Sequence, residues 1–134
     1  MIEVCIYRNI NGSISKYWIN GHSRFSRLPK LVDFILRNLY SKQYAGYPEA
    51  GRDVVCAAVS SIAQTPVIGL KEVVNLHIGL ETDEKTGYLE CILPEHISAE
   101  DRIKADIILE TMYLSLKNVE KQFSKLVKVV EMEV

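Results

Sequence analysis

The sequence has few cysteines, no long uninterrupted apolar run and no cluster of basic residues, and each absence narrows the class of protein. Its three cysteines are an odd number without a CxxC pair, which argues against a disulfide framework or a zinc site. No apolar run approaches the roughly 20 residues of a membrane span, and the N-terminus reaches a charge and a turn too early for a signal peptide. The net charge is −1, with scattered basic residues. We therefore expect a cytoplasmic globular protein that contacts neither membrane nor nucleic acid directly.

Alternating apolar residues predict two β-hairpins. Residues 2–6 alternate on one face, Asn11-Gly12 is a strong two-residue turn signal, and residues 14–19 return. The segment EVVNLHIGLE, residues 72–81, alternates again, and after a polar turn YLECIL, residues 88–93, pairs back with it. The side chains that we expect to face inward from this second pair are Val74, Leu76, Ile78, Leu80, Leu89, Cys91 and Leu93.

Helical spacing and capping residues predict two helices. RDVVCAAVSSIAQT, residues 52–65, is typical of a buried helix of about three turns, with Asp53 as its N-cap and Pro66 beyond its end. A longer helix opens at Ser98-x-x-Asp101, a capping box. Its apolar stripe is wide enough to suit a dimer contact, or to be covered by another part of the chain.

The order of these elements predicts a single α+β domain over residues 1–134. With a final strand in KLVKVVEMEV, it would be a two-layer sandwich of about five mostly antiparallel strands with two helices on one face. Residues 24–50 form an insert after the first hairpin. Within it, residues 28–42 have helical spacing, and YAGYPEAG has the glycine and proline residues typical of a loop. We expect this mobile or helical insert to be a lid, a dimer contact or a packed ornament.

Cys56, in the stretch GRDVVCAAVSS, is the residue on which the functional interpretation depends. If Asp53 caps the helix, Cys56 lies in its first turn, where unsatisfied N–H groups and the macrodipole favour a thiolate. The negative charge of Asp53 would work partly against this. The alternative is a buried thiol that acts as a small hydrophobe, as we expect for Cys5 and Cys91 in their strands.

Three histidines are candidates for a proton-transfer partner. His22, in NGHS, follows a predicted strand and Gly21, and loops at strand ends often carry catalytic groups. His77 lies on the polar face of a predicted strand and His96 in a loop, so we expect both at the surface. The residues alone leave a Cys56–His22 dyad and a structural thiol both open.

The paired motif NGHS and GRDVVCAAVSS resembles the GHA…GxDIVCAAVS signature of the ribosomal-processing cysteine protease family (Prp, YsxB-like), and the resemblance extends over the whole chain. It implies that His22 and Cys56 are the catalytic pair. Asp53 would orient His22 or only cap the helix. Ser60, one helical turn after the cysteine, would support the thiolate or the substrate by a hydrogen bond.

The resemblance also implies a mechanism and a set of partners. Backbone N–H groups of Val55 and Cys56 would be oxyanion donors, and Gly21 and Gly51 the loop glycines. Family members are homodimers that use no metal or cofactor. They remove a short N-terminal extension from the large-subunit ribosomal protein whose tail approaches the peptidyl-transferase centre.

Two departures from the signature leave the substrate open. GHS replaces GHA, and 33 residues separate His22 from Cys56, well over twice the usual family interval. The alternative function is a non-catalytic peptide-binding module on the same scaffold, associated with the ribosome. A redox-sensing thiol is disfavoured, because no resolving cysteine is close to Cys56 in sequence.

Overall fold

The computed structural model describes residues 1–21 and 48–133; of residues 48–53 only the backbone is described. The predicted helix within residues 28–42 and most of the predicted insert therefore lie outside the described residues. The described elements follow the order β1 (Ile2–Arg8), β2 (Ile14–Asn20), α2 (Pro48–Ile68), η3 (Gly69–Val73), β3 (Gly79–Asp83), β4 (Tyr88–Ile92), α3 (Ala99–Gln122) and β5 (Val127–Glu133).

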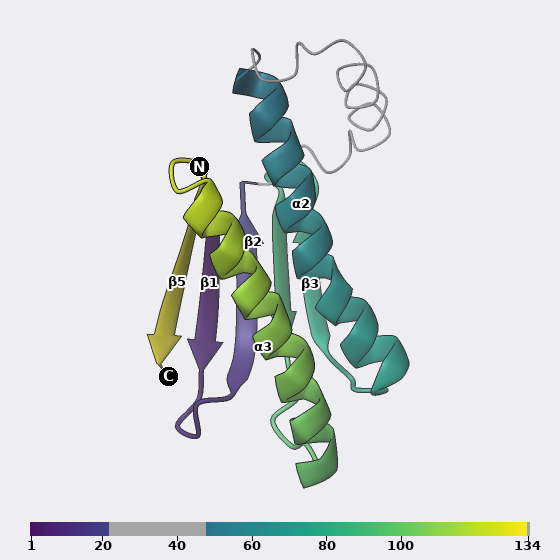
Figure 1. Ribbon diagram of the computed structural model, residues 1–134. Helices are drawn as coiled ribbons and strands as arrows, with labels where there is room; N and C mark the ends of the chain where they lie inside the picture. Colours follow the sequence, from purple (N-terminus) through teal and green to yellow (C-terminus); the bar gives the residue numbers. More distant parts are fainter. Residues whose placement is uncertain (22–47, 134) are drawn as a thin grey trace.

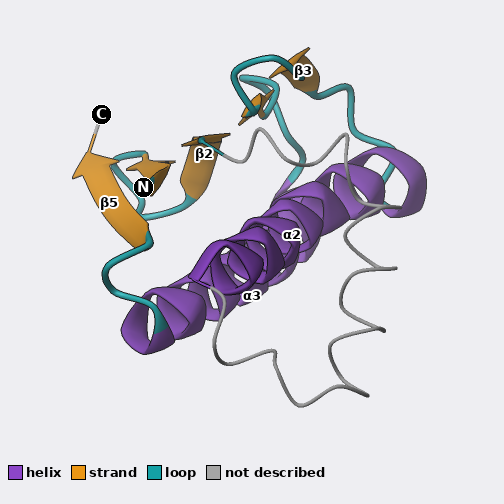
Figure 2. Cartoon of the chain, turned by 90° about the horizontal axis from the view of Figure 1, so that it is seen from above, coloured by secondary structure: helices purple, strands orange, loops and turns teal. Residues whose placement is uncertain are grey.

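The five strands form one mixed sheet in the order β3-β4-β2-β1-β5. Neighbouring strands are antiparallel except β5, which runs parallel to β1. Both helices lie on the same face of this sheet (Figures 1 and 2). The predicted α+β sandwich of mostly antiparallel strands with two helices on one face is confirmed.

The first hairpin is confirmed, but its connection is longer than the two-residue turn we predicted. The side chain of Asn9 accepts hydrogen bonds from the N–H groups of Asn11 and Ser13, at 2.9 and 3.1 Å. Gly12 has φ +83°, a left-handed conformation that favours glycine. The turn signal therefore located the bend correctly, while the Asn9 side chain sets the length of the loop.

Helix α2 is longer than predicted at both ends. It begins at Pro48, so Asp53 is not its N-cap, and the last residues of the predicted loop, including Gly51, are helical. Proline is favourable at the first helical position, because its missing N–H would have no partner there. At the other end Pro66 lies inside the helix, which continues to Ile68 and then into the π-helical turn η3.

The predicted strand over residues 72–81 is wrong in its first half. The N–H of Val74 donates to the carbonyl of Gly69 at 3.0 Å and closes η3, and Asn75 has φ +63°. Only Gly79–Asp83 is extended. The second hairpin itself is confirmed, and from β4 the predicted inward residues Leu89 and Cys91 are buried.

Helix α3 begins where the sequence predicts, because the Ser98 hydroxyl accepts the N–H of Asp101 at 3.1 Å. Polar contacts hold it on the sheet. Arg8 of β1 binds both carboxylate oxygens of Glu110, and Arg102 donates to the carbonyl of Ile14 at 2.7 Å. The buried residues of α3 are Ala105, Leu109, Met112 and Leu116.

One described segment, Val54–Val73, is long and apolar enough to cross a membrane by length and composition, with a mean hydropathy of 1.4. This corrects the expectation that no such run exists. The serines within α2 interrupt the apolar residues but do not lower the mean hydropathy of the segment far enough. A helix that packs in a protein core meets the same criterion. Val55, Val59 and Ala63 of this segment are buried in one core with the sheet residues.

Gly21, the last described residue after β2, is required by the backbone at that point. It has φ +92°, and a Cβ built on it would lie 2.7 Å from the carbonyl oxygen of Met1. Real Cβ atoms do not approach so closely, and the obstacle is main chain rather than a flexible side chain. Gly21 therefore fixes the path of the chain directly before His22.

Gly21→Ala is expected to destabilise the protein more than Gly12→Ala does. Gly12 also has a positive φ but nothing within 4 Å of a built Cβ, so alanine there costs only about 1–2 kcal/mol of backbone strain. Gly21→Ala adds the clash with Met1. Urea denaturation of both variants measures the difference, and equal losses of unfolding free energy would contradict this account.

Candidate active site

Cys56 lies in the third turn of α2, on the side that packs against the sheet. Its side chain is 2% exposed and belongs to the main core cluster. The helix begins eight residues before it, so Cys56 is not in the first turn as predicted. Because the effect of the macrodipole falls off within the first turn, the helix start does not stabilise a thiolate here.

The same correction applies to the predicted oxyanion donors. Inside an α-helix each N–H donates to the carbonyl four residues earlier. Val55 and Cys56 are both interior residues of α2, so their N–H groups belong to the helical ladder and not to the unsatisfied first turn. While the helix is intact, they are not available to hold an oxyanion.

Ser60 follows Cys56 by one turn on the buried side of α2. Its side chain is completely buried, and within the described residues its Oγ has no hydrogen-bond partner. Helical serines often donate to the carbonyl four residues back, which here is that of Cys56, but this bond is not formed. A buried hydroxyl without a partner costs about 1–3 kcal/mol. The structure thus holds an unsatisfied hydroxyl one turn from the candidate nucleophile.

The other two cysteines lie in strands and are also buried. Burial raises the pKa of the Cys91 thiol to about 11, although contact with the Tyr17 hydroxyl lowers it in part. Cys91 is therefore a neutral thiol at physiological pH, as expected for a structural cysteine. His77 and His96 are both exposed, as predicted.

The end of β2 and the first half of α2 lie at the same end of the molecule (Figure 1). The hydroxyl of Tyr17 donates to the carbonyl of Ala63 at 2.6 Å and ties this strand to the helix. His22 follows Gly21 but lies outside the described residues, and so does the side chain of Asp53. The dyad and the role of Asp53 as orienter of His22 therefore stay predictions.

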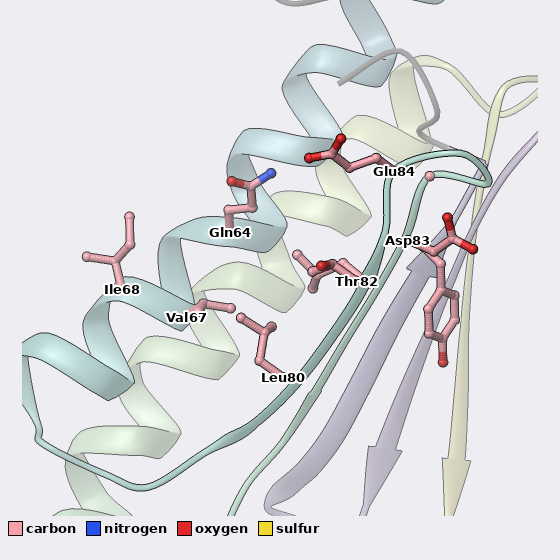
Figure 3. A pocket seen from close by; sticks show the side chains of 10 residues that line it. Gln64, Val67, Ile68, Leu80, Thr82, Asp83 and Glu84 are labelled. Atoms are coloured by element: carbon pink, nitrogen blue, oxygen red, sulfur yellow. The ribbon is translucent and has the colours of Figure 1, made fainter. Parts of the chain in front are cut away.

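The sequence interpretation missed a pocket of about 230 Å³ between α2 and β3 (Figure 3). Apolar side chains from the two elements line it, and acidic side chains of the β3–β4 turn lie at its end. In the part of the chain that the structure describes, no group of three or more histidine, cysteine or acidic residues could hold a metal ion. The pocket residues are Gln64, Val67, Ile68, Leu80, Thr82, Asp83, Glu84, Gly87, Tyr88 and Leu89.

The sequence of this two-layer protein matches a known class of cysteine protease. The model of the family "Cysteine protease Prp" matches residues 33–128, more than half of the chain. The chain belongs to this family and is a cysteine protease. The matched range includes Cys56 and Ser60 but not His22.

One relative is similar to this chain in sequence, and two solved structures are similar to it in fold. The ribosomal processing cysteine protease Prp of Bacillus subtilis is 29% identical over 123 residues, which cover 92% of this chain and 90% of that protein. The fold is similar to SMU.848 from Streptococcus mutans, with TM-score 0.73, 22% identity and coverage of 100% and 96%. It is also similar to Prp from S. aureus in complex with a substrate peptide, with TM-score 0.71, 20% identity and coverage of 98% and 100%.

Ser60→Ala is expected to raise the free energy of unfolding by about 1 kcal/mol or more, because it removes a buried hydroxyl without a partner and improves helix propensity. Ser61→Ala is the matched control: Ser61 is exposed on the same helix, so only the propensity gain of a few tenths of a kcal/mol remains. Chemical denaturation measures both. A loss of stability in Ser60→Ala alone would show that its hydroxyl is hydrogen-bonded in solution.

Proposed function

We propose that this cysteine protease acts in the cytoplasm and removes an N-terminal extension from a large-subunit ribosomal protein. The family assignment supports this, as does the name of the B. subtilis relative, with which the similarity covers nine-tenths of both chains. Prp from S. aureus, which has the same fold, has been solved with a substrate peptide and with a covalently linked product peptide. The observation specific to this chain is the buried, unpartnered Ser60 hydroxyl one turn from Cys56.

In the proposed mechanism Cys56 is the nucleophile and His22 the base. His22 accepts the thiol proton, and the sulfur attacks the scissile carbonyl; the C–N bond then breaks and His22 returns the proton to the leaving amine. This leaves a thioester. Water, deprotonated by His22, attacks the thioester; the C–S bond breaks, and the departing thiolate takes the proton back from His22. The Ser60 hydroxyl donates a hydrogen bond to the thiolate, which gives this buried group the partner it otherwise lacks.

A cysteine in the helix interior depends more on His22 for its ionisation than a cysteine in the first turn would. A thiolate in the helix interior gains little from the macrodipole, and burial disfavours its charge. An imidazolium beside it would lower the pKa of the thiol by an opposite charge at short range. The proposal therefore requires that the ring of His22 reach the sulfur when substrate is bound.

Cys56→Ala is expected to abolish cleavage while the protein remains folded. The test substrate is a synthetic peptide that copies the N-terminal extension encoded in the same genome, and mass spectrometry detects the two products. Cys91→Ala is the matched control, since it removes an equally buried thiol whose raised pKa makes it inert. Cleavage by Cys56→Ala at the wild-type rate would exclude Cys56 as nucleophile. Binding without cleavage by the wild type would favour a peptide-binding module.

We also propose that the protein is a homodimer and that α3 forms the contact. Three large apolar side chains of α3, Ile103, Ile107 and Leu114, are each more than 60% exposed. At 100° per residue they lie within about 40° of one another around the helix. Such a line of exposed apolar side chains is typical of a protein contact surface.

Ile107→Glu is expected to convert the dimer to a monomer, because it places a charge in the proposed contact. Sedimentation velocity at several concentrations measures the change. Ile10→Glu, at an exposed isoleucine of the β1–β2 turn, is the control and should leave the association state unchanged. A wild-type protein that is monomeric at all concentrations, or an Ile107→Glu dimer as stable as the wild type, would contradict the proposal.

A further inference from the structure

The pocket between α2 and β3 has one apolar wall on each element. Val67 and Ile68 line it from the helix and Leu80 from the strand, and Asp83 and Glu84 stand at the end next to the β3–β4 turn (Figure 3). Its volume of about 230 Å³ is below the roughly 300–1,000 Å³ of typical small-molecule sites. A single large side chain fits this space better than a separate small ligand.

The strand beside the pocket has a free edge. β3 is the first strand of the sheet order, and among the described residues its only strand partner is β4. Leu80 and Thr82 pair with the buried residues Cys91 and Leu89, so they point to the helix side of the sheet. Leu80 nevertheless remains 45% exposed. An edge of this kind can accept an extended peptide as an additional strand.

The pocket is in line with the candidate nucleophile along α2. Val67 follows Cys56 by eleven residues, which at 100° per residue places the two side chains about 20° apart around the helix. The separation along the axis is about 16 Å at 1.5 Å per residue. An extended peptide covers that distance in about five residues at roughly 3.3 Å each.

We propose that this groove is a specificity subsite for the peptide substrate. An extended segment about five residues from the scissile bond pairs with the free edge of β3 and inserts one large apolar side chain between Val67 and Leu80. A basic residue beside that position meets Glu84, and no basic side chain lines the groove among the described residues. The inference rests on the proposed proteolytic function, and it assigns the groove to this substrate and to no second ligand.

The direct test measures peptide binding to Cys56→Ala, which cannot cleave the peptide. In this background Leu80→Glu is expected to raise the Kd for the ribosomal-protein peptide used above by at least tenfold. Ile92→Glu is the matched control: Ile92 is 41% exposed on the neighbouring strand, but it points to the opposite face of the sheet. It should change the Kd by less than twofold. Equal Kd values for the two variants, with both folded, would overturn the subsite.

A charge exchange tests the acidic end of the groove. Each basic residue of the peptide is replaced in turn by glutamate, and the peptides are compared on wild type and Glu84→Lys by kcat/KM. We expect one peptide position, about five residues from the scissile bond, at which the loss on wild type is at least fivefold and is restored by Glu84→Lys. Glu95→Lys, after the far end of β4, should restore nothing. Absence of any such position would refute the charge assignment.

Failure of the subsite and failure of the proposed function give different results. If the wild type cleaves the peptide and Leu80→Glu cleaves it equally well, the protease function stands and the subsite is wrong. If Cys56→Ala binds the peptide with the expected loss in Leu80→Glu but the wild type does not cleave it, the groove is confirmed and the proteolytic function fails. If the peptide neither binds nor is cleaved, both are overturned.

Discussion

The packing of one side of α2 against the sheet is the constraint on which the site depends. Cys56 and Ser60 lie on this side, and the hydrogen bond from Tyr17 to the carbonyl of Ala63 joins the same side to β2. A side that must stay buried for stability therefore also carries the sulfur of the proposed nucleophile. A lone thiolate in such surroundings would be strongly disfavoured. The chemistry consequently favours proton transfer to a close base over a permanently ionised cysteine.

Ser60 is a residue of the candidate site that lowers the stability of the core. The core around it is apolar, and an alanine would fill the position without an unsatisfied hydroxyl. Local features that cost stability are found most often where they serve function. The helix interior also explains why the hydroxyl matters: without the first-turn N–H groups that we predicted around Val55 and Cys56, other donors must stabilise the charge on sulfur. Ser60, one turn from Cys56 on the same side of α2, supplies such a donor in the proposed mechanism.

The sequence predicts those elements whose signals are local. The Asn11-Gly12 bend and the Ser98 cap each require only a few neighbouring residues, and both were confirmed. The start of α2 was not predictable in the same way, because Pro48 and Asp53 are both good helix starts and only the fold selects between them. Because of that one error, the prediction placed Cys56 in the first turn of the helix instead of in its interior. The predicted alternation failed in residues 72–78, where the chain is in η3 and the turn after it, because a short apolar run does not distinguish a strand from a helical turn.

The two sides of the edge strand β3 have different roles: one discourages pairing with other copies of the chain, and the other forms the proposed peptide subsite. Glu81 and Asp83 point to the side of the sheet away from the helices, where charge discourages pairing with other copies of the chain. Leu80 and Thr82 point to the helix side and leave an apolar opening beside Val67. A strand that pairs here must therefore present an apolar residue on one side and tolerate acidic neighbours on the other. The alternation of β3 thus selects among extended peptides, before any contact with the sulfur is made.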